Sequence, residues 1–294
     1  MKHLLLTLVL FLSTILANAQ DDFSYVPSVG VYTGIINYEG DLKPNSFTFQ
    51  HSNFFFSLYL HQPILPHIVW RLGGSIGKLE AADRYNRDYL KSRNLSFYTN
   101  IQELYSGFEL SLFDIDNKRI TPYVFVGGAM FHFNPYTYDK NGKKVYLQPL
   151  STEGQGLADY PNRKPYQLTQ FALTWAGGIK YKVNDYINVG VELNQRKTFT
   201  DYLDDVSSSY VDYNKLLQTK GAKAVELAYR GDELPNGSSY PHDGEQRGTP
   251  NEKDWYYFLG VHATFRVDFI KSSIENLFSG SGSAYYNKRC PSNF

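Results

Sequence analysis

The strongest constraint on the fold is a two-residue alternation near the carboxyl end of the chain. In WYYFLGVHATFRVDF, residues 255–269, every second side chain from Trp255 to Phe269 is apolar, and the other face includes His262 and Arg266. A period of two is typical of a β-strand with one apolar and one polar face. This segment is longer than the usual strand of about 5 to 6 residues, and it suits a tilted membrane-crossing strand, which needs about 9 to 11.

Seven further segments alternate in the same way with varying clarity. Residues 186–199 place Val191 on the apolar face and Glu192 on the polar face, and residues 169–183 do the same with Leu173 and Lys180. The other segments are residues 28–38, 53–62, 67–79, 100–113 and 120–133. The last one is nearly continuous in apolar residues, so the sequence leaves open which of its side chains point outward. Eight strands are an even number and the smallest size of single-chain outer-membrane barrels.

The connections between these segments alternate strictly in length. Long polar connections cover residues 39–52, 80–99, 134–168 and 200–254, and short ones lie at 63–66, 114–118 and 184–185. Short periplasmic turns and long external loops are what an outer-membrane barrel requires. The sequence therefore predicts an all-β protein, an eight-stranded antiparallel transmembrane β-barrel with long external loops.

A soluble lipocalin-like barrel is the alternative, because periodicity alone does not say which face points outward. Trp70, Trp175 and Trp255 are expected near strand ends, where an interfacial aromatic belt would place them, and this favours the membrane barrel. The 25 tyrosines, 20 phenylalanines and 23 glycines also suit a β architecture. The net charge of zero gives no basic patch for nucleic acid.

The first residues are typical of a secretory signal peptide. An apolar run from Leu4 to Leu16 precedes Ala17-Asn18-Ala19, a small-x-small cleavage pattern. We expect a signal peptide over residues 1–19, the barrel over residues 20–269 and a periplasmic carboxyl-terminal tail over residues 270–294. No later run of about 18 apolar residues predicts a transmembrane helix.

A barrel of this size is expected to be filled by side chains rather than open. The charged residues on the polar faces balance, and we expect them to pair with one another. These residues are Arg71, Glu103, Glu109, Lys180, Glu192, Arg196, Arg266 and Asp268. The loop aspartates are expected to face solvent, without the tight clustering that a calcium site needs. They are Asp41, Asp83, Asp114, Asp116, Asp204 and Asp205.

The sequence shows no motif for catalysis, a cofactor or a metal. His61, His132 and His262 are candidate inward-facing residues, and a structural, hydrogen-bonded role is expected for them because spacing fixes no serine beside them. The segment RKTFTDYLDDVS, residues 196–207, spaces Tyr202, Leu203 and Val206 like one side of a helical turn. We expect this turn to fold back onto the rim of the barrel.

Three segments carry a resemblance to a known family. VGVYTGIINYEGDL at 29–42, KTFTDYLDDVS at 197–207 and NKRCPSNF at 287–294 resemble the PorG-like outer-membrane proteins of the type IX secretion system. The motif residues are Gly40, Asp41, Leu42, Thr200, Asp201, Tyr202, Leu203, Asp204 and Asp205. The external inserts at 134–167 and 208–253 match no pattern of that family.

The resemblance implies a non-enzymatic protein of the outer membrane. It would tether a periplasmic ring, built from a lipoprotein of the PorK or GldK type and a partner of the PorN or GldN type, to that membrane. The system exports protein cargo and is coupled to gliding motility in some bacteria. The alternatives are a channel or adhesion barrel that works through its external loops, and a lipid-modifying barrel enzyme with a Ser–His pair.

Cys290 is the single cysteine of the chain, so no disulfide can form within one molecule. An even strand count and a periplasmic amino terminus place the chain after Phe269 in the oxidising periplasm, where a thiol is either inert or bonded to another chain. Together with the resemblance, this predicts a disulfide to the ring lipoprotein. Arg289 favours the reactive thiolate and Pro291 fixes the backbone beside it.

Overall fold

The computed structural model describes residues 25–43, 51–115, 118–237 and 239–278. Within them, eight long antiparallel strands form a closed barrel, because each strand pairs with its chain neighbours and the first pairs with the last. They are β1 (Ser28–Glu39), β2 (Asn53–Leu65), β3 (Ile68–Ala82), β4 (Ser96–Ser111), β5 (Ile120–His132), β8 (Thr169–Lys182), β9 (Ile187–Thr198) and β10 (Trp255–Arg266). The predicted eight-stranded antiparallel barrel is confirmed.

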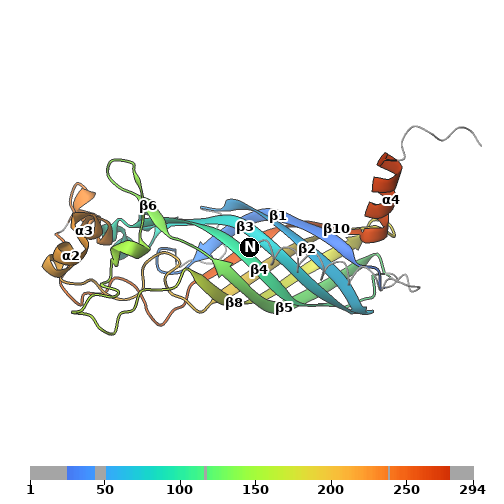
Figure 1. The fold of residues 1–294 in the computed structure, drawn as a ribbon, viewed down its shortest axis with the longest axis horizontal. Helices are drawn as coiled ribbons and strands as arrows, with labels where there is room; N and C mark the ends of the chain where they lie inside the picture. The colour runs from blue at the N-terminus through green and yellow to red at the C-terminus, as the bar shows by residue number, and fades with distance from the viewer. Residues whose placement is uncertain (1–24, 44–50, 116–117, 238, 279–294) are drawn as a thin grey trace, which may run out of the picture.

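The two ends of the barrel differ (Figure 1). At one end, which we call the loop end, the long connections carry the short strands and most helices. They are η2 (Asp83–Tyr85), η3 (Asp88–Arg93), β6 (Tyr136–Tyr138), β7 (Lys144–Tyr146), η4 (Gln148–Leu150), α2 (Tyr213–Lys220), α3 (Ala222–Ala228) and η5 (Gly231–Glu233). The short turns and α4 (Val267–Phe278) lie at the other end, the turn end.

The outer surface of the barrel wall is apolar. Side chains on all eight strands alternate between this surface and the interior, as the period-two pattern predicts. In β5, whose facing the sequence left open, Phe125 and Phe131 point inward while Val124 and Val126 are exposed. Exposed apolar side chains on the other strands include Phe54, Phe56, Leu58, Ile76, Leu104, Phe108, Leu110, Phe171, Leu173, Ile179, Val189, Val191, Leu259 and Val261.

The interior of the barrel is filled by charged and aromatic side chains. Glu109 contacts both Arg71 and Lys180, and Arg71 also donates to Glu192 at 2.7 Å. Nearer the loop end, Arg196 donates to Glu103 at 2.7 Å. Arg71 and Arg196 are among the largest fully buried side chains, and aromatic rings pack around them. The predicted pairing of buried charges is therefore present.

Two predictions about inward-facing residues are wrong. His61 and His262 are buried, but His132 is exposed on β5 and contacts Thr169 at 3.0 Å, because it has the outward parity of Val124 and Val126. Asp268 lies in α4 rather than on an inward face, and it pairs at 2.7 Å with the half-buried Arg266 at the turn end.

The carboxyl-terminal boundary of the barrel also differs from the prediction. β10 ends at Arg266 and α4 begins at Val267, so the alternation that continues to Phe269 is not all strand. Phe269 stacks on Tyr186 of the neighbouring turn, with ring centroids 5.4 Å apart. Cys290, Arg289 and Pro291, as well as the signal peptide at 1–19, lie outside the described residues.

The tryptophans agree with the prediction in part. Trp255 begins β10 and Trp70 lies near the start of β3, but Trp175 lies in the middle of β8. Trp175 contacts Trp255 edge to face at 5.3 Å, which places it beside a residue at the loop end of the wall. Among the described residues, every helix falls short of the length and hydropathy that a bilayer-spanning helix requires.

Candidate functional site at the barrel mouth

The two motif segments that lie far apart in the sequence meet over the loop end of the barrel. Gly40, Asp41 and Leu42 follow β1, and residues 200–207 follow β9. The backbone N–H of Leu42 donates to Asp204 Oδ2 at 3.3 Å, and Leu42 and Leu203 join the apolar core of the barrel. We call this assembly the mouth cluster. It is formed by Tyr38, the motif residues, Glu153, Arg247 and Asp254.

Gly40 allows the close approach of the first segment. It forms a tight turn in which its N–H donates to the carbonyl of Lys43 at 3.0 Å. A Cβ atom at this position would overlap Asp254 Oδ1 and the hydroxyl of Tyr38. A glycine is therefore required here by space rather than by a special backbone angle.

One tyrosine hydroxyl lies between two carboxyl groups. The Tyr38 hydroxyl oxygen is 2.7 Å from Asp204 Oδ2 and 2.8 Å from Asp254 Oδ1. Because a phenol has one hydrogen to donate, the second contact is a hydrogen bond if one of the two aspartates is protonated. Burial, together with the neighbouring acidic groups, raises the pKa of both Asp204 and Asp254 well above the ordinary value.

The backbone of residues 200–207 is held by the same carboxyl groups. The N–H of Leu203 donates to Asp254 Oδ2 at 2.9 Å, and the N–H of Val206 donates to Asp204 Oδ1 at 2.9 Å. Asp205 has a left-handed φ of 66°. The predicted helical turn is thus wrong, because carboxylates rather than backbone carbonyls accept from these N–H groups. Leu203 and Val206 nevertheless pack onto the barrel core.

Asp201 is the least satisfied member of the mouth cluster. Its side chain is buried, and in the described part of the chain neither carboxylate oxygen has a partner at full hydrogen-bonding geometry. Burial raises the pKa of Asp201 to about 7, although the neighbouring Ser207 lowers it. Burial likewise raises the pKa of Asp205 to about 6, against the opposing effect of Arg247.

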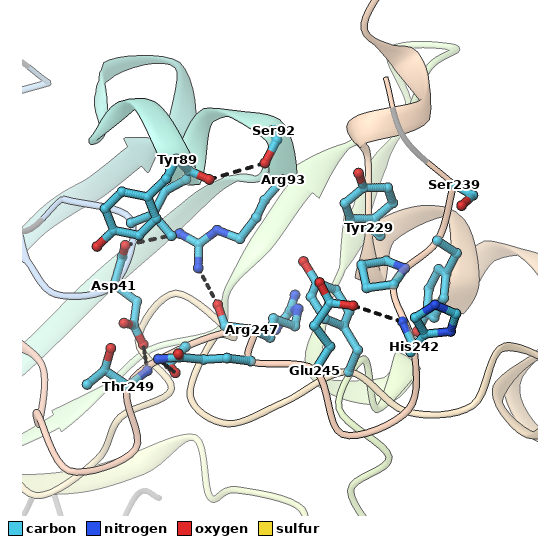
Figure 2. A pocket seen from close by; sticks show the side chains of 16 residues that line it. Asp41, Tyr89, Ser92, Arg93, Tyr229, Ser239, His242, Glu245, Arg247 and Thr249 are labelled. Carbon is cyan, nitrogen blue, oxygen red and sulfur yellow. Dashed lines mark hydrogen bonds between the residues drawn. The ribbon is translucent and has the colours of Figure 1, made fainter. Parts of the chain in front are cut away.

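Two buried arginines join the loops around the mouth cluster (Figure 2). Arg247 donates to Glu153 at 2.9 Å and to the carbonyl of Ala228 at 3.1 Å. Arg93 donates to Asp83 at 2.6 Å and to the carbonyl of Asp41 at 3.1 Å. Four separate long connections are therefore linked through these guanidinium groups.

The loop aspartates do not face solvent as predicted. Asp83 and Asp205 are fully buried, Asp204 is 2 % exposed, and Asp41 and Asp114 are half-buried. Asp116 lies outside the described residues. The prediction rested on the usual exposure of acidic loop residues, and it failed for Asp83, Asp204 and Asp205 because the long loops that carry them fold over the barrel and exclude water.

The remaining motif residues surround these acids. Thr200 accepts from the N–H of Asp254 through its carbonyl at 3.1 Å. Tyr202 is half-buried, stacks on Tyr166 with centroids 4.7 Å apart, and donates to Glu153 at 3.3 Å. Tyr38 lies in the first motif segment, but sequence reasoning gave it no role in the site. Glu153, Arg247 and Asp254 lie outside both motif segments and have no characteristic spacing, so sequence reasoning missed them.

The contacts of the mouth cluster join the loops to one another and to the barrel. Among the described residues, no group of His, Cys, Asp or Glu has a geometry that could hold a metal ion. Inside the barrel, His262 contacts the hydroxyls of Tyr59 at 3.2 Å and Tyr123 at 2.9 Å, and His61 contacts Glu109 at 3.2 Å. These contacts match the structural role expected for both histidines.

The chain was compared with protein-family models, with curated proteins and with solved structures. The model of a family described as "Domain of unknown function (DUF6089)" matches residues 2–221. No curated protein matches the chain. The similar solved structures include the attachment invasion locus protein Ail of Yersinia pestis, with 7 % identity, a TM-score of 0.37 and coverage of 82 % of this chain and 98 % of that chain.

Two further solved structures are similar over the same share of this chain. Neisserial surface protein A has 7 % identity and a TM-score of 0.39 over 82 % of this chain and 96 % of that chain. The amino-terminal β-barrel domain of OprF from Pseudomonas aeruginosa has 10 % identity and a TM-score of 0.33 over 82 % and 98 %.

Proposed function

The chain belongs to the DUF6089 family, and we propose that this member is a non-enzymatic barrel of the bacterial outer membrane that anchors a periplasmic protein assembly. The observation that carries the proposal is the distribution of polarity across the barrel wall. Charged side chains fill the interior, while apolar side chains lie on the outside of the strands, exposed on seven of them and half-buried on β1.

A lipid environment accounts for the outer surface. Val126, Leu173 and Val191 are 57 %, 50 % and 53 % exposed. A continuous apolar surface around a barrel is unfavourable in water, but it suits contact with lipid chains. A soluble lipocalin-like barrel would carry the opposite arrangement, with its apolar face around an internal cavity. The Arg71 and Arg196 ion pairs therefore favour the membrane barrel.

The filled interior favours anchoring over transport. Arg71 crosses the interior between Glu109 on β4 and Glu192 on β9, and Arg196 pairs with Glu103 at a second level. An open channel needs a wide, water-filled lumen, which eight strands do not provide once side chains occupy the inside. A barrel with a filled interior would therefore contact its partners through the loops and turns at its two ends.

The assembly that we propose as partner is the ring of the type IX secretion system. The resemblance of residues 29–42, 197–207 and 287–294 to PorG-like proteins supports this proposal, and the short turns would then face the periplasm. α4 projects from that end of the barrel (Figure 1) and carries Ile274 at 50 % exposure. Contact with a lipoprotein of the PorK or GldK type, and with its PorN or GldN partner, would occur there, with Cys290 forming an intermolecular disulfide.

Affinity purification tests this proposal. The tagged protein would be purified from membranes in mild detergent without reductant, beside its Cys290→Ser variant. We expect ring lipoprotein to copurify with both forms, and a high-mass band that collapses on reduction with the wild type alone. Absence of ring proteins from both preparations would refute the ring assignment, and copurification without the band would refute only the disulfide.

Membrane fractionation tests the underlying barrel separately. The mature protein is expected in the outer-membrane fraction, and it should resist extraction with alkaline carbonate because its strands are embedded in lipid. Recovery as a water-soluble monomer would overturn the membrane proposal whatever the outcome of the purification.

A further inference from the structure

A cavity of about 440 Å³ opens among the loops beyond the mouth cluster (Figure 2). Its walls come from three connections. Asp41 follows β1, Tyr89 and Arg93 belong to the connection after β3, and residues 210–249 belong to the connection after β9. The volume lies in the range of about 300 to 1,000 Å³ that is typical of small-molecule sites. We call this space the tyrosine cavity.

Aromatic rings form much of its surface. Tyr210, Tyr229 and Tyr240 pack edge to face, with the centroid of Tyr210 5.8 Å from each of the others. Tyr89 also lines the cavity and is 68 % exposed. Tyrosine presents a flat apolar face together with a polar edge. A ligand of this cavity would therefore have an apolar face and polar groups at its rim.

Among the described residues, two buried hydroxyl groups of this cluster have no partner at full hydrogen-bonding geometry, although the Tyr240 hydroxyl lies near the backbone of Val211. They belong to Tyr210, which is 2 % exposed, and to Tyr240, which is half-buried. Burial raises the pKa of Tyr210, so its hydroxyl keeps the hydrogen and can donate. A buried unsatisfied hydroxyl has a free-energy cost that a ligand with hydrogen-bonding oxygens would remove.

The two arginines in the wall are already paired. Arg93 pairs with Asp83 at 2.6 Å, and Arg247 pairs with Glu153 at 2.9 Å. Both guanidinium groups also donate to backbone carbonyls. Neither arginine is therefore available as a dedicated partner for a phosphate or sulfate group, and the carboxyl groups of Asp41 and Glu245 in the same wall further disfavour an anionic ligand.

We propose that the tyrosine cavity binds a neutral saccharide. A pyranose ring has the required chemistry, because its C–H face packs on tyrosine rings and its hydroxyl groups surround that face. Tyr89 would supply an accessible stacking surface, and Tyr210 would donate a hydrogen bond at the buried side. The inference is independent of the ring partner proposed above, since the cavity lies at the loop end, away from α4.

Binding to a panel of probes tests the proposal. The full chain in detergent would be titrated calorimetrically with maltotriose, cellotriose and mannotriose, and also with a sulfated trisaccharide and a tyrosine-containing tripeptide. We expect at least one neutral trisaccharide to bind in preference to the sulfated probe and the peptide. Failure of all three neutral probes, or binding of the charged or peptide probe alone, would overturn the proposal.

Two variants locate the binding. Tyr210→Phe keeps the ring and removes the hydroxyl, so the dissociation constant should rise about threefold to tenfold, the effect of one lost hydrogen bond. Tyr89→Ala removes the exposed stacking face and should weaken binding at least as much. Tyr146→Phe changes an exposed tyrosine of β7 outside the cavity wall and should have no effect. Unchanged affinity in both cavity variants would place the bound saccharide elsewhere and refute the site.

Discussion

At the scale of single residues, the mouth cluster retains protons at pH values where carboxyl groups are normally ionised. The pKa of Asp201 is raised from 3.8 to about 7. The stabilisation from its neutral form is therefore fully present below pH 3.8 and is lost as the pH rises through about 7. Asp205 contributes in the same direction, with a pKa of about 6.

We predict that the mouth cluster opens more readily as the pH rises from 5 to 8, and that Asp201→Asn reduces this dependence. The amide of asparagine stays neutral, so its burial does not become more costly at high pH. Hydrogen exchange of the segment from 199 to 208, corrected for the intrinsic rate, measures the opening. Asp159→Asn, which alters an exposed carboxyl group at the same end, serves as the control. Equal pH slopes in wild type and Asp201→Asn would contradict the assignment.

A second prediction concerns the space at Gly40. The Gly40→Ala variant should lose about 1 to 3 kcal/mol of unfolding free energy, because the added methyl group overlaps Asp254 and the Tyr38 hydroxyl. Urea unfolding in detergent measures this loss. Gly177→Ala is the matched control, since a Cβ atom there meets nothing within 4 Å. Similar unfolding of the two variants would show that the mouth tolerates the methyl group.

The residues of the mouth cluster were only partly accessible to sequence reasoning. The resemblance identified Asp41 and Asp204 as motif residues, but the contact between their two segments follows from how the loops fold over one another. Arg247 and Glu153 pair across 94 positions of the chain, and no periodic pattern marks such a contact. No pattern marks the burial of the loop aspartates either, and they were therefore expected to face solvent.

At the scale of elements, the barrel strands were predictable because each must separate an apolar surface from a polar interior. This requirement imposes a period of two on all eight strands. The connections at the turn end were predictable because they are short. Residues 200–207 and 267–269 were assigned wrongly, since local spacing cannot show that carboxylates cap the first segment or that a helix replaces the end of β10.

The third prediction concerns the coupling of strands through Arg71. Replacing Arg71 with methionine leaves Glu109 and Glu192 without their shared cation, so unfolding should become easier by about 3 to 5 kcal/mol. Lys78→Met on the same strand removes a half-buried pair with Glu80 near the loop end and should cost less than about 1 kcal/mol. The midpoints of urea unfolding compare the two. A loss in Arg71→Met no greater than in Lys78→Met would contradict the role of the buried network.

At the scale of the whole molecule, the barrel is closed both along its length and at its mouth. Ion pairs occupy the interior at two levels, and the mouth cluster covers the loop end. We predict that the purified protein in planar bilayers lacks the stable conductance of an open porin. The Arg71→Met variant provides the comparison, because it weakens one level of the filling. A steady ion current through the wild type would favour the channel alternative.

Because β1 pairs with β10, the barrel sheet is closed and neither strand is an edge strand. Ser28 lies opposite Arg266 in the closed sheet, so a short flexible linker could join these positions and new termini could be introduced at Gly142, between β6 and β7. Such a circularly permuted chain would keep every strand neighbour while dispensing with the segments that flank the barrel. Folding of the wall and attachment to other proteins would thereby become separable properties of one polypeptide.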